Sequence, residues 1–405
     1  MLARPRLILG SLGLLVLLGC SGGSGHQSSY AYLVNGVAVA DLDGNGLPDI
    51  LGMVSVDVDG APAQGYVATR LQNAAGAFVL PSRFGVGRGP ANLVAADVNG
   101  DGRMDLVVAN AHEQTVTVRP ADAAHPGSFL PAVTLPLSGR TPLDVAVGDL
   151  NGDGLLDIAV AAPTVASPTG APLPAPAVTV FFQTPGTSLA FGPPVSFLVG
   201  GNPQAVAIAD LDGNGRADLA VATSANTVAV LLQTITGTMG AAVSYPTGVQ
   251  PVALKAADLN GDGKLDLLTA NWGAATGPDT QGLSVLLQTS GGAFAAPVHC
   301  ATDFRSAALA VGDLNGDGRL DVVVANAGLP GDPGSVSVFL QSPTTPGALN
   351  SPTNYVGVWG PMGVALADLN GDGLPDLVLA DGDLVVRFSR SSSPGTFGTP
   401  SFFYY

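Results

Sequence analysis

The residues best able to do chemistry in this chain are aspartates and asparagines in a nine-residue pattern that occurs seven times. The pattern is Asp-x-(Asp/Asn)-Gly-(Asp/Asn)-Gly-x-x-Asp, and successive copies begin 48 to 61 residues apart. Calcium takes six to eight hard oxygen ligands, and a tight loop supplies them when oxygens recur at alternate positions. We therefore expect each copy to bind one structural Ca²⁺, about seven in the whole chain.

The expected ligands are the side chains at positions 1, 3, 5 and 9 of each copy and the backbone carbonyl at position 7. In chain order they are Asp41, Asp43, Asn45, Leu47, Asp49, Asp97, Asn99, Asp101, Arg103, Asp105, Asp149, Asn151, Asp153, Leu155, Asp157, Asp210, Asp212, Asn214, Arg216, Asp218, Asp258, Asn260, Asp262, Lys264, Asp266, Asp313, Asn315, Asp317, Arg319, Asp321, Asp368, Asn370, Asp372, Leu374 and Asp376. Each copy starts like an EF-hand loop, but an aspartate at position 9 closes it, so the loop should join two strands. A metal-free turn is the alternative for any one copy, because Asp, Asn and Gly are ordinary turn residues. The sevenfold recurrence favours calcium.

The charge of the chain agrees with metal binding. The formal net charge is −16, and the chain has 31 acidic residues, three of them in each copy of the pattern. Three carboxylates a few ångströms apart repel one another unless a cation lies between them. The acidity therefore reflects metal ligands, and a net negative chain argues against nucleic acid as a partner.

Short apolar runs position these loops. Each unit holds four such runs, which are rich in β-branched residues and bounded by Gly, Pro, Asn and Asp. In the fifth unit they span 251–258, 266–271, 283–288 and 293–301. A four-strand unit repeated seven times predicts an all-β fold, a seven-bladed β-propeller with four-stranded antiparallel blades.

The ends of the chain predict how the ring closes. The first unit begins at its inner strand, 34–41, and the last ends with an outer strand, 395–405. We therefore expect the first blade to pack on the last without a shared blade, with Tyr30, Tyr32, Tyr404 and Tyr405 at the seam. The fourth run of other units is expected around residues 78–81, 191–194 and 397–400.

These residues resemble the FG-GAP/VCBS repeat family. The resemblance rests on the seven loops and on fragments near the FG and GAP signatures, Phe84-Gly85, Gly89-Pro90 and Ala161-Ala162-Pro163, and it covers residues 30–405. The family includes the seven-bladed head of integrin α-subunits. The resemblance implies that positions 1, 3, 5, 7 and 9 are calcium ligands in the hairpin between the first two strands of a blade. Most copies lack a full FG or GAP, which is similar to the bacterial VCBS-type branch.

The N-terminus is typical of a lipoprotein leader. Arg4 and Arg6 precede an apolar run, 7–18, that is too short to span a bilayer, and Cys20 follows as in a bacterial lipobox. We expect a signal peptide at 1–19, a lipidated Cys20 with a flexible tether at 20–29, and the propeller at 30–405. This predicts a cell-envelope protein, lipid-anchored at the outer membrane or cell surface. A plain secretory signal with a chance cysteine is the alternative.

No catalytic constellation is found in the sequence. The four histidines are scattered, and Cys300 is expected to be an inert buried thiol, because His299 and Cys300 would point to opposite faces of a strand. Aspartates outside the loops are interpreted as solvated surface groups; they are Asp57, Asp59, Asp144, Asp279, Asp303, Asp332, Asp381 and Asp383. Some could instead serve as acid–base pairs.

Strand direction places the calcium loops on one face of the ring and the longest other loops on the opposite face. That opposite face also receives Trp272 and Trp359. Aromatic side chains on loops suit carbohydrate or protein recognition, although both rings could simply seal blade ends. We expect a binding or adhesion module for a glycan or protein partner. A secreted carbohydrate-active enzyme, such as a polysaccharide lyase or hydrolase, and a structural scaffold of an envelope complex are the alternatives.

Overall fold

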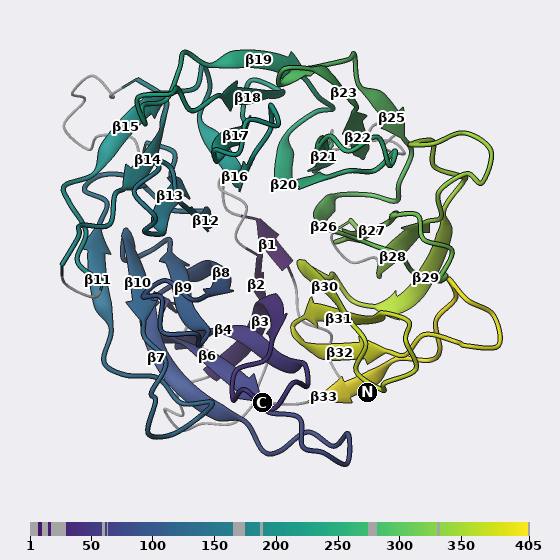
Figure 1. Ribbon diagram of the computed structural model, residues 1–405. Coiled ribbons are helices and arrows are strands. Elements are labelled where there is room, and N and C mark those ends of the chain that lie inside the picture. Colours follow the sequence, from purple (N-terminus) through teal and green to yellow (C-terminus); the bar gives the residue numbers. More distant parts are fainter. Residues whose placement is uncertain are drawn as a thin grey trace.

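Seven blades are arranged around a central axis (Figure 1). The computed structural model describes residues 7–9, 15–17, 30–58, 61–62, 64–164, 175–186, 189–273, 282–329 and 333–403. Every element in this part of the chain is a strand, and no helix in it is long and apolar enough to cross a membrane. The predicted all-β fold, a seven-bladed propeller with four-stranded antiparallel blades, is confirmed.

Each blade runs from an inner strand beside the axis to an outer strand at the rim. The first three blades are β3 (Tyr30–Ala40), β4 (Asp49–Val58), β6 (Gln64–Arg70), β7 (Ser82–Arg88); β8 (Pro90–Ala96), β9 (Asp105–Asn110), β10 (Thr115–Arg119), β11 (Val133–Pro136); and β12 (Asp144–Gly148), β13 (Asp157–Ala161), β14 (Ala177–Phe181), β15 (Val195–Leu198). The next two are β16 (Pro203–Ala209), β17 (Asp218–Thr223), β18 (Thr227–Leu231), β19 (Val243–Pro246); and β20 (Pro251–Ala257), β21 (Asp266–Asn271), β22 (Leu283–Leu286), β25 (Val298–Cys300). The last two are β26 (Ser306–Gly312), β27 (Asp321–Asn326), β28 (Gly334–Phe339), β29 (Thr353–Val358); and β30 (Gly363–Ala367), β31 (Asp376–Asp381), β32 (Asp383–Arg387), β33 (Ser401–Phe403).

A few short strands lie outside the four-strand pattern. They are β5 (Ala61–Pro62) on β4, the pair β23 (Gln288–Ser290) and β24 (Ala293–Phe294), and the pair β1 (Leu7–Leu9) and β2 (Leu15–Leu17). The β1–β2 pair falls within the expected signal peptide. Cys20 and the expected tether at 20–29 lie outside the described residues.

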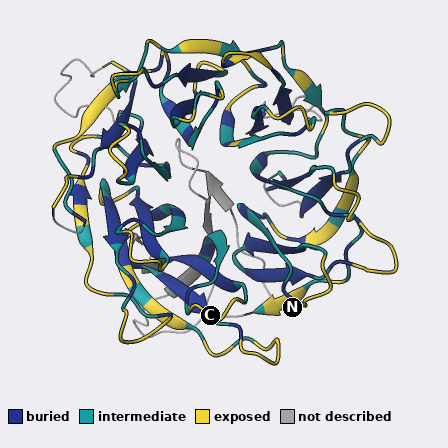
Figure 2. Cartoon of the chain, viewed as in Figure 1, coloured by how far each residue is buried: buried dark blue, intermediate teal, exposed yellow. Residues whose placement is uncertain are grey.

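The hydrophobic core is a series of layers between neighbouring blades. One layer joins Val107 and Val116 of the second blade to Ile158 and Val160 of the third, and comparable layers join the other neighbours. Figure 2 shows this distribution, with the second and third strands buried and the outer strands exposed. Because each blade buries both of its faces, the alternating Val, Leu and Ala of the sequence serve two interfaces at once.

The ring closes as expected, by packing the first blade on the last. The Val34 amide donates to the Gly382 carbonyl at 2.9 Å, and the Phe78 ring meets Phe403 edge-on at 5.9 Å between centroids. The Arg70 guanidinium lies 5.5 Å from the centre of the same Phe403 ring. Tyr404, Tyr405 and the side chains of Tyr30 and Tyr32 lie outside the part of the chain that is described, so their place at the seam stays a prediction.

The expected position of the fourth strand was wrong in three units. Phe78, Phe191 and Phe397 form single bridges in the turn that precedes the outer strand, and β7, β15 and β33 begin only after the following proline. Proline has no amide hydrogen to donate to a sheet, so the ladder starts beyond it.

Candidate functional site

The seven aspartate loops connect the first and second strands of their blades and share one geometry. In every loop the backbone amide of the position-6 glycine donates to Oδ2 of the position-1 aspartate at 2.7–2.8 Å. The position-5 amide donates to Oδ1 of the same aspartate at 2.9–3.2 Å. The first aspartate therefore holds the turn closed around its own carboxylate.

The glycines at positions 4 and 6 make this turn possible. Their φ angles lie between 72° and 79° at position 4 and between 81° and 85° at position 6. L-residues with a Cβ rarely adopt this left-handed conformation, whereas glycine adopts it at little cost. The sequence pattern and the backbone geometry thus explain each other.

The aspartate at position 9 has a second role that the sequence did not suggest. It opens the second strand, is completely buried in all seven copies, and its Oδ2 accepts the position-2 amide at 2.8–3.1 Å. Its Oδ1 accepts the backbone amide of the residue two positions beyond the end of the third strand, at 2.6–2.9 Å. This carboxylate therefore ties three segments of each blade together.

Burial raises the pKa of these position-9 carboxyls above the usual range, in Asp157 to about 6. Backbone amides lower the pKa, and the neighbouring loop aspartates raise it again. A cation among these oxygens would act in the opposite direction, because it favours the ionised form.

The donor set fits a hard divalent cation. Carboxylate oxygens of Asp41, Asp43 and Asp49 all lie within 4.8 Å of one another, and those of Asp210, Asp212 and Asp218 do the same. One Ca²⁺ with bonds of about 2.3–2.6 Å can bridge oxygens at such separations. In the other five loops position 3 is asparagine and position 5 is aspartate, so the same positions offer oxygens with the charge placed differently.

The cationic side chain at position 7 competes for the position-5 carboxylate in three loops. Lys264 Nζ lies 2.7 Å from Asp262, Arg319 pairs with Asp317, and Arg103 lies 3.7 Å from Asp101. Position 7 is leucine in three other loops, at Leu47, Leu155 and Leu374. The loops are therefore alike in backbone but not in charge.

A belt of hydrogen bonds links each loop to the next blade. In five blades a glutamine lies two residues beyond the end of the third strand. The side-chain amide nitrogen Nε2 of Gln72 donates to the Leu369 carbonyl at 2.6 Å. This bond crosses the seam between the first and last blades. The side-chain amides of the other four glutamines donate to carbonyls of the preceding blade's loop in the same way; the pairs are Gln183 with Val98, Gln233 with Asp149, Gln288 with Leu211, and Gln341 with Leu259. For Gln183 the bond forms in the side-chain orientation in which both its oxygen and its nitrogen have partners.

Backbone amides replace glutamine in the two blades that lack it. The Gly127 amide donates to Leu42 at 3.2 Å, and the Gly395 amide donates to Leu314 at 3.0 Å. Every loop therefore contributes a carbonyl to a bond with its neighbour. The recurring glutamine at the end of the third apolar run was the sequence signal for this belt, but its partner could only be found in the closed ring.

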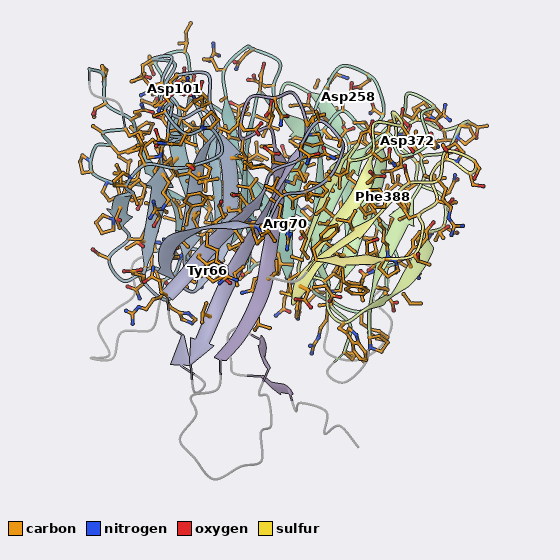
Figure 3. The ribbon with its side chains drawn as sticks, turned by 90° about the horizontal axis from the view of Figure 1, so that it is seen from below. Tyr66, Arg70, Asp101, Asp258, Asp372 and Phe388 are labelled. Carbon is orange, nitrogen blue, oxygen red and sulfur yellow. The ribbon has the colours of Figure 1, made fainter. Side chains whose placement is uncertain are left out.

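The two faces of the ring differ in what they present. We call the face that carries the seven loops the aspartate face, and Asp101, Asp258 and Asp372 lie along it in Figure 3. The opposite face, with Trp272 and Trp359, is the tryptophan face. Trp359 is 71% exposed, whereas Trp272 is half-buried with the Arg305 guanidinium 5.5 Å from its ring centre.

A central channel of about 1580 Å³ runs between the inner strands, and both tryptophans line it. Gln250 and Asp381 lie beside them: the Trp272 amide donates to the Gln250 carbonyl at 2.8 Å, and the Trp359 amide donates to Asp381 at 2.8 Å. The tryptophan face thus offers aromatic rings, amide groups and a carboxylate around one opening. The sequence placed both tryptophans on this face but did not reveal that they share the mouth of a channel.

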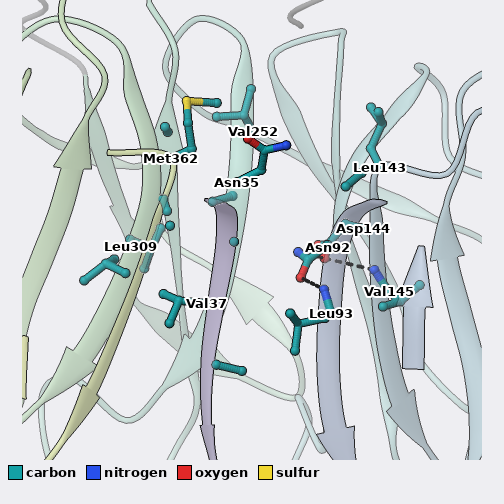
Figure 4. Close-up of a pocket in the computed structure, with 18 of the residues that line it drawn as sticks. Asn35, Val37, Asn92, Leu93, Leu143, Asp144, Val145, Val252, Leu309 and Met362 are labelled. Atoms are coloured by element: carbon teal, nitrogen blue, oxygen red, sulfur yellow. Dashed lines mark hydrogen bonds between the residues drawn. The ribbon is translucent and has the colours of Figure 1, made fainter. Parts of the chain in front are cut away.

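Three aspartates interpreted as solvated surface groups are engaged in the structure instead. Asp144 accepts from Asn92 Nδ2 of the second blade and from the Val206 amide of the fourth blade at 2.9 Å. Figure 4 shows Asn92 and Asp144 side by side in the channel wall. Asp381 accepts the Trp359 amide, and Asp303 accepts the Ser335 hydroxyl at 2.9 Å. Burial raises the pKa of Asp144 and of Asp381 to about 6. The interpretation was wrong for Asp144 and Asp381 because they begin and end strands at the inner edge of the ring, and for Asp303 because its loop packs against Ser335.

His299 and Ser284 form a pair that resembles a nucleophilic dyad but is already satisfied. The Ser284 hydroxyl lies 3.1 Å from His299 Nδ1, and it also accepts from Asn271 Nδ2 and the Gly248 amide, both at 2.9 Å. Ser284 is completely buried, so its oxygen cannot reach a substrate. Cys300, next in the chain, points to the other side of β25, into the core layer, where half-burial raises the thiol pKa as an inert thiol requires.

Comparisons with known proteins agree with this architecture. The model of the FG-GAP-like repeat matches residues 97–160, 210–269, 274–324 and 313–379, which together make up more than half of the chain. No curated protein sequence matches the chain significantly.

Solved structures with a similar fold have diverse roles. A putative 6-phosphogluconolactonase from Bacteroides uniformis has a TM-score of 0.56 at 12% identity, over 93% of this chain and 99% of that one. BBS1N in complex with ARL6DN has a TM-score of 0.54 at 13% identity, over 90% and 94% of the two chains. A Bacillus licheniformis rhamnogalacturonan lyase has a TM-score of 0.51 at 15% identity, over 95% and 74%. At such identities the likeness shows the fold alone.

Proposed function

Because this chain belongs to the family of FG-GAP-like repeat proteins, we propose that it is a calcium-stabilised binding module of the cell envelope that recognises a glycan or protein partner. The observation that carries the proposal is the division between the two faces. Seven near-identical loops occupy the aspartate face, and aromatic and polar groups surround a channel mouth on the other. Repetition serves the fold, whereas the irregular face is free to be selective.

Calcium would act on the aspartate face as a structural ion. The side chains at positions 1, 3, 5 and 9 and the carbonyl at position 7 would hold it, and it would offset two of the three negative charges in each loop. The loops with leucine at position 7 should bind it more tightly than those in which Lys264, Arg319 or Arg103 already pairs with position 5. Since each loop also bonds to the next blade, the ion would stiffen the ring as well as the hairpin.

Recognition would occur at the tryptophan face. Trp359 exposes most of its ring beside Asp381 and the channel opening, and an exposed aromatic ring next to hydrogen-bonding groups suits a sugar ring or a peptide side chain. Among the similar folds is a propeller bound to a partner protein and a lyase, so the fold is compatible with either role.

A carbohydrate-active enzyme is the second candidate, and one observation favours it. Asp144 and Asp381 line the channel with pKa values raised to about 6, as carboxyls with acid–base roles often are. Their oxygens, however, already accept backbone amides of neighbouring blades or loops. We therefore favour binding, with these carboxylates as structural and contact groups.

The envelope location rests on the N-terminal pattern around Cys20. Lipidation there would hold the module close to a membrane through the tether at 20–29. A Cys20→Ser variant should leave the membrane fraction, and the mass of the native protein should include acyl chains. A variant that stays membrane-bound, with a native mass free of acyl chains, would refute the anchor.

A binding screen tests the proposed function. Purified protein is applied to arrayed glycans and surface polymers with calcium and with EDTA, alongside Trp359→Ala and the control Ile235→Ala. Ile235 is 88% exposed on the aspartate face. Like Trp359→Ala, Ile235→Ala therefore removes an exposed apolar side chain, but at a site away from the channel. Binding that Trp359→Ala weakens and Ile235→Ala retains supports the proposal; product formation from a bound polymer would favour the enzyme instead.

A further inference from the structure

The chain contains two lysines, and they occupy very different places. Lys264 lies in an aspartate loop and pairs with Asp262 at 2.7 Å. Lys255 lies in the inner strand β20 and lines the central channel. In the described part of the chain, no oxygen lies within hydrogen-bonding or ion-pairing distance of its ammonium group.

The repeat makes Lys255 an exception at its level of the channel. It stands three residues before the first aspartate of its loop. The equivalent residues of the other six blades are small and apolar; they are Ala38, Val94, Ala146, Ala207, Ala310 and Ala365. One ammonium group therefore projects into a ring of aliphatic side chains. Low-dielectric walls of this kind focus the field of the ammonium group and strengthen its attraction for an entering anion relative to the same pair on an open surface.

A polar pair lies closer to the mouth. Asp144 stands five residues before its loop and Lys255 three, which is a difference of about 7 Å along the strands. Asp144 accepts three hydrogen bonds, from Asn92, Val145 and Val206, and a carboxylate has about four acceptor sites, so one remains for a ligand hydroxyl. The channel is thus aromatic at its mouth, then hydrogen-bonding, then positively charged.

We propose that the channel binds the terminal residue of an acidic glycan, with a uronate carboxylate on Lys255, a hydroxyl on Asp144 and Asn92, and the following sugars leading toward Trp359 at the mouth. This deepens the proposed binding function and rests on it. A monoanion matches a single ammonium group, whereas the nearby Asp144 carboxylate would repel the second charge of a phosphate. The channel volume of about 1580 Å³ exceeds that of typical small-molecule pockets, which leaves room for a sugar ring.

The test measures affinity by calorimetry in calcium buffer. The probes are the di-uronides of galacturonate, glucuronate and mannuronate, their free monosaccharides, and the corresponding neutral disaccharides. The chain-end hypothesis predicts that at least one di-uronide binds better than its monosaccharide, because the second ring adds contacts between Lys255 and the channel mouth. Equal affinity of monosaccharide and dimer would mean that the channel binds a free uronic acid, and it would overturn the chain-end assignment.

Variants isolate the charge. Lys255→Met should weaken binding of the di-uronide about tenfold or more, as expected when a charge-assisted hydrogen bond is lost. Lys255→Arg should restore most of it. The matched control is Arg390→Met, which removes one exposed cation from the aspartate face and should change nothing.

A spectroscopic readout separates direct contact from a change in fold. Reductive methylation with ¹³C labels the two lysines, and Lys255→Met identifies the Lys255 signal. Addition of the di-uronide should shift that signal and leave the Lys264 signal in place. Binding of neutral glycans or a protein without any di-uronide affinity would overturn this inference while the proposed function stands. The absence of any partner in either screen would overturn both.

Discussion

The two faces of the ring are built from the same seven units but have diverged in opposite ways. On the aspartate face, the hydrogen-bond lengths within the loops vary by only 0.1 Å at the bond that closes the turn, from 2.7 to 2.8 Å. On the tryptophan face, the blades differ in loop length, in charge and in the aromatic residues they carry. Uniformity on one side separates what the fold requires from the variation on the other side, which the proposed recognition would use.

The difference has a physical origin in where each loop bonds. A loop of the aspartate face is tied to its own second and third strands through position 9 and to the next blade through the glutamine belt. A change there disturbs both hairpin and ring. A loop of the tryptophan face ends at strand termini and the channel mouth, so its side chains can vary without breaking the ladders.

The largest effect should come from removing calcium. At a dissociation constant of about 0.1 mM and about 1 mM calcium, linkage contributes about 1.4 kcal/mol per site, and on the order of 10 kcal/mol for all seven loops as an upper value. EDTA should therefore lower the melting temperature by many degrees and expose the chain to proteases. Calorimetric titration should count about seven ions.

The assignment of the aspartate face to calcium binding would be wrong if the metal-free protein and the calcium-loaded protein had the same melting temperature. Two or fewer ions bound at saturation would have the same consequence. In either case the loops would be metal-free turns, and the uniformity of the aspartate face would reflect only the tie through position 9.

The next largest effect separates the two roles of the loop aspartates. Asp157→Ala leaves two buried amides unpaired, those of Leu150 and Gln183, at a cost of roughly 2–6 kcal/mol even in EDTA. Asp153→Ala in the same loop removes an exposed carboxylate and should cost under about 1 kcal/mol in EDTA. Both variants should lose one calcium site. Equal destabilisation without metal, measured by urea unfolding, would contradict the structural role of position 9.

The loops illustrate how much the sequence could predict. Repetition predicted the turn, the blade and the number of blades, because those depend on contacts within about 60 residues. The inter-blade belt joins residues up to 297 positions apart, as in the bond from Gln72 to Leu369, and its partner is defined only when the ring has closed. Lys255 and Asp144 likewise share a channel only because blades three and five face the same axis.

Substitutions of the two tryptophans should change the free energy of unfolding less than the loop substitutions do, while they weaken partner binding. Trp359→Ala should weaken partner binding by roughly 1–2 kcal/mol, with a change in stability within about 0.5 kcal/mol because the ring is 71% exposed. Trp272→Ala should also cost stability, because that ring is half-buried against Arg305. Affinity and melting temperature measured on the same preparations distinguish the two. Parallel losses in Trp359→Ala would make its ring structural and leave the tryptophan face without the proposed recognition element.

The smallest effect concerns Asp144 of the third blade, which accepts hydrogen bonds from the second and fourth blades. Burial raises its pKa to about 6, and the charge of Lys255 opposes that shift. A carboxyl whose pKa is higher in the folded protein favours folding while it is protonated, so this contribution is full below about pH 4 and is lost as the pH rises through about 6.

Lys255→Met should therefore raise the pKa of Asp144 further, and the variant should lose stability relative to the native protein above pH 6 but not at pH 4. Lys255→Arg should behave as the native protein does. Carboxyl ¹³C chemical shifts measured against pH would follow Asp144 directly, and melting curves at pH 4 and pH 7.5 would follow its consequence. In an Asp144→Asn background the effect of Lys255→Met on stability should disappear. The loop aspartates titrate alike with and without Lys255→Met, so their contributions cancel when the two stabilities are subtracted. An effect that persists there would mean that Lys255 acts through packing in the channel and not through its charge.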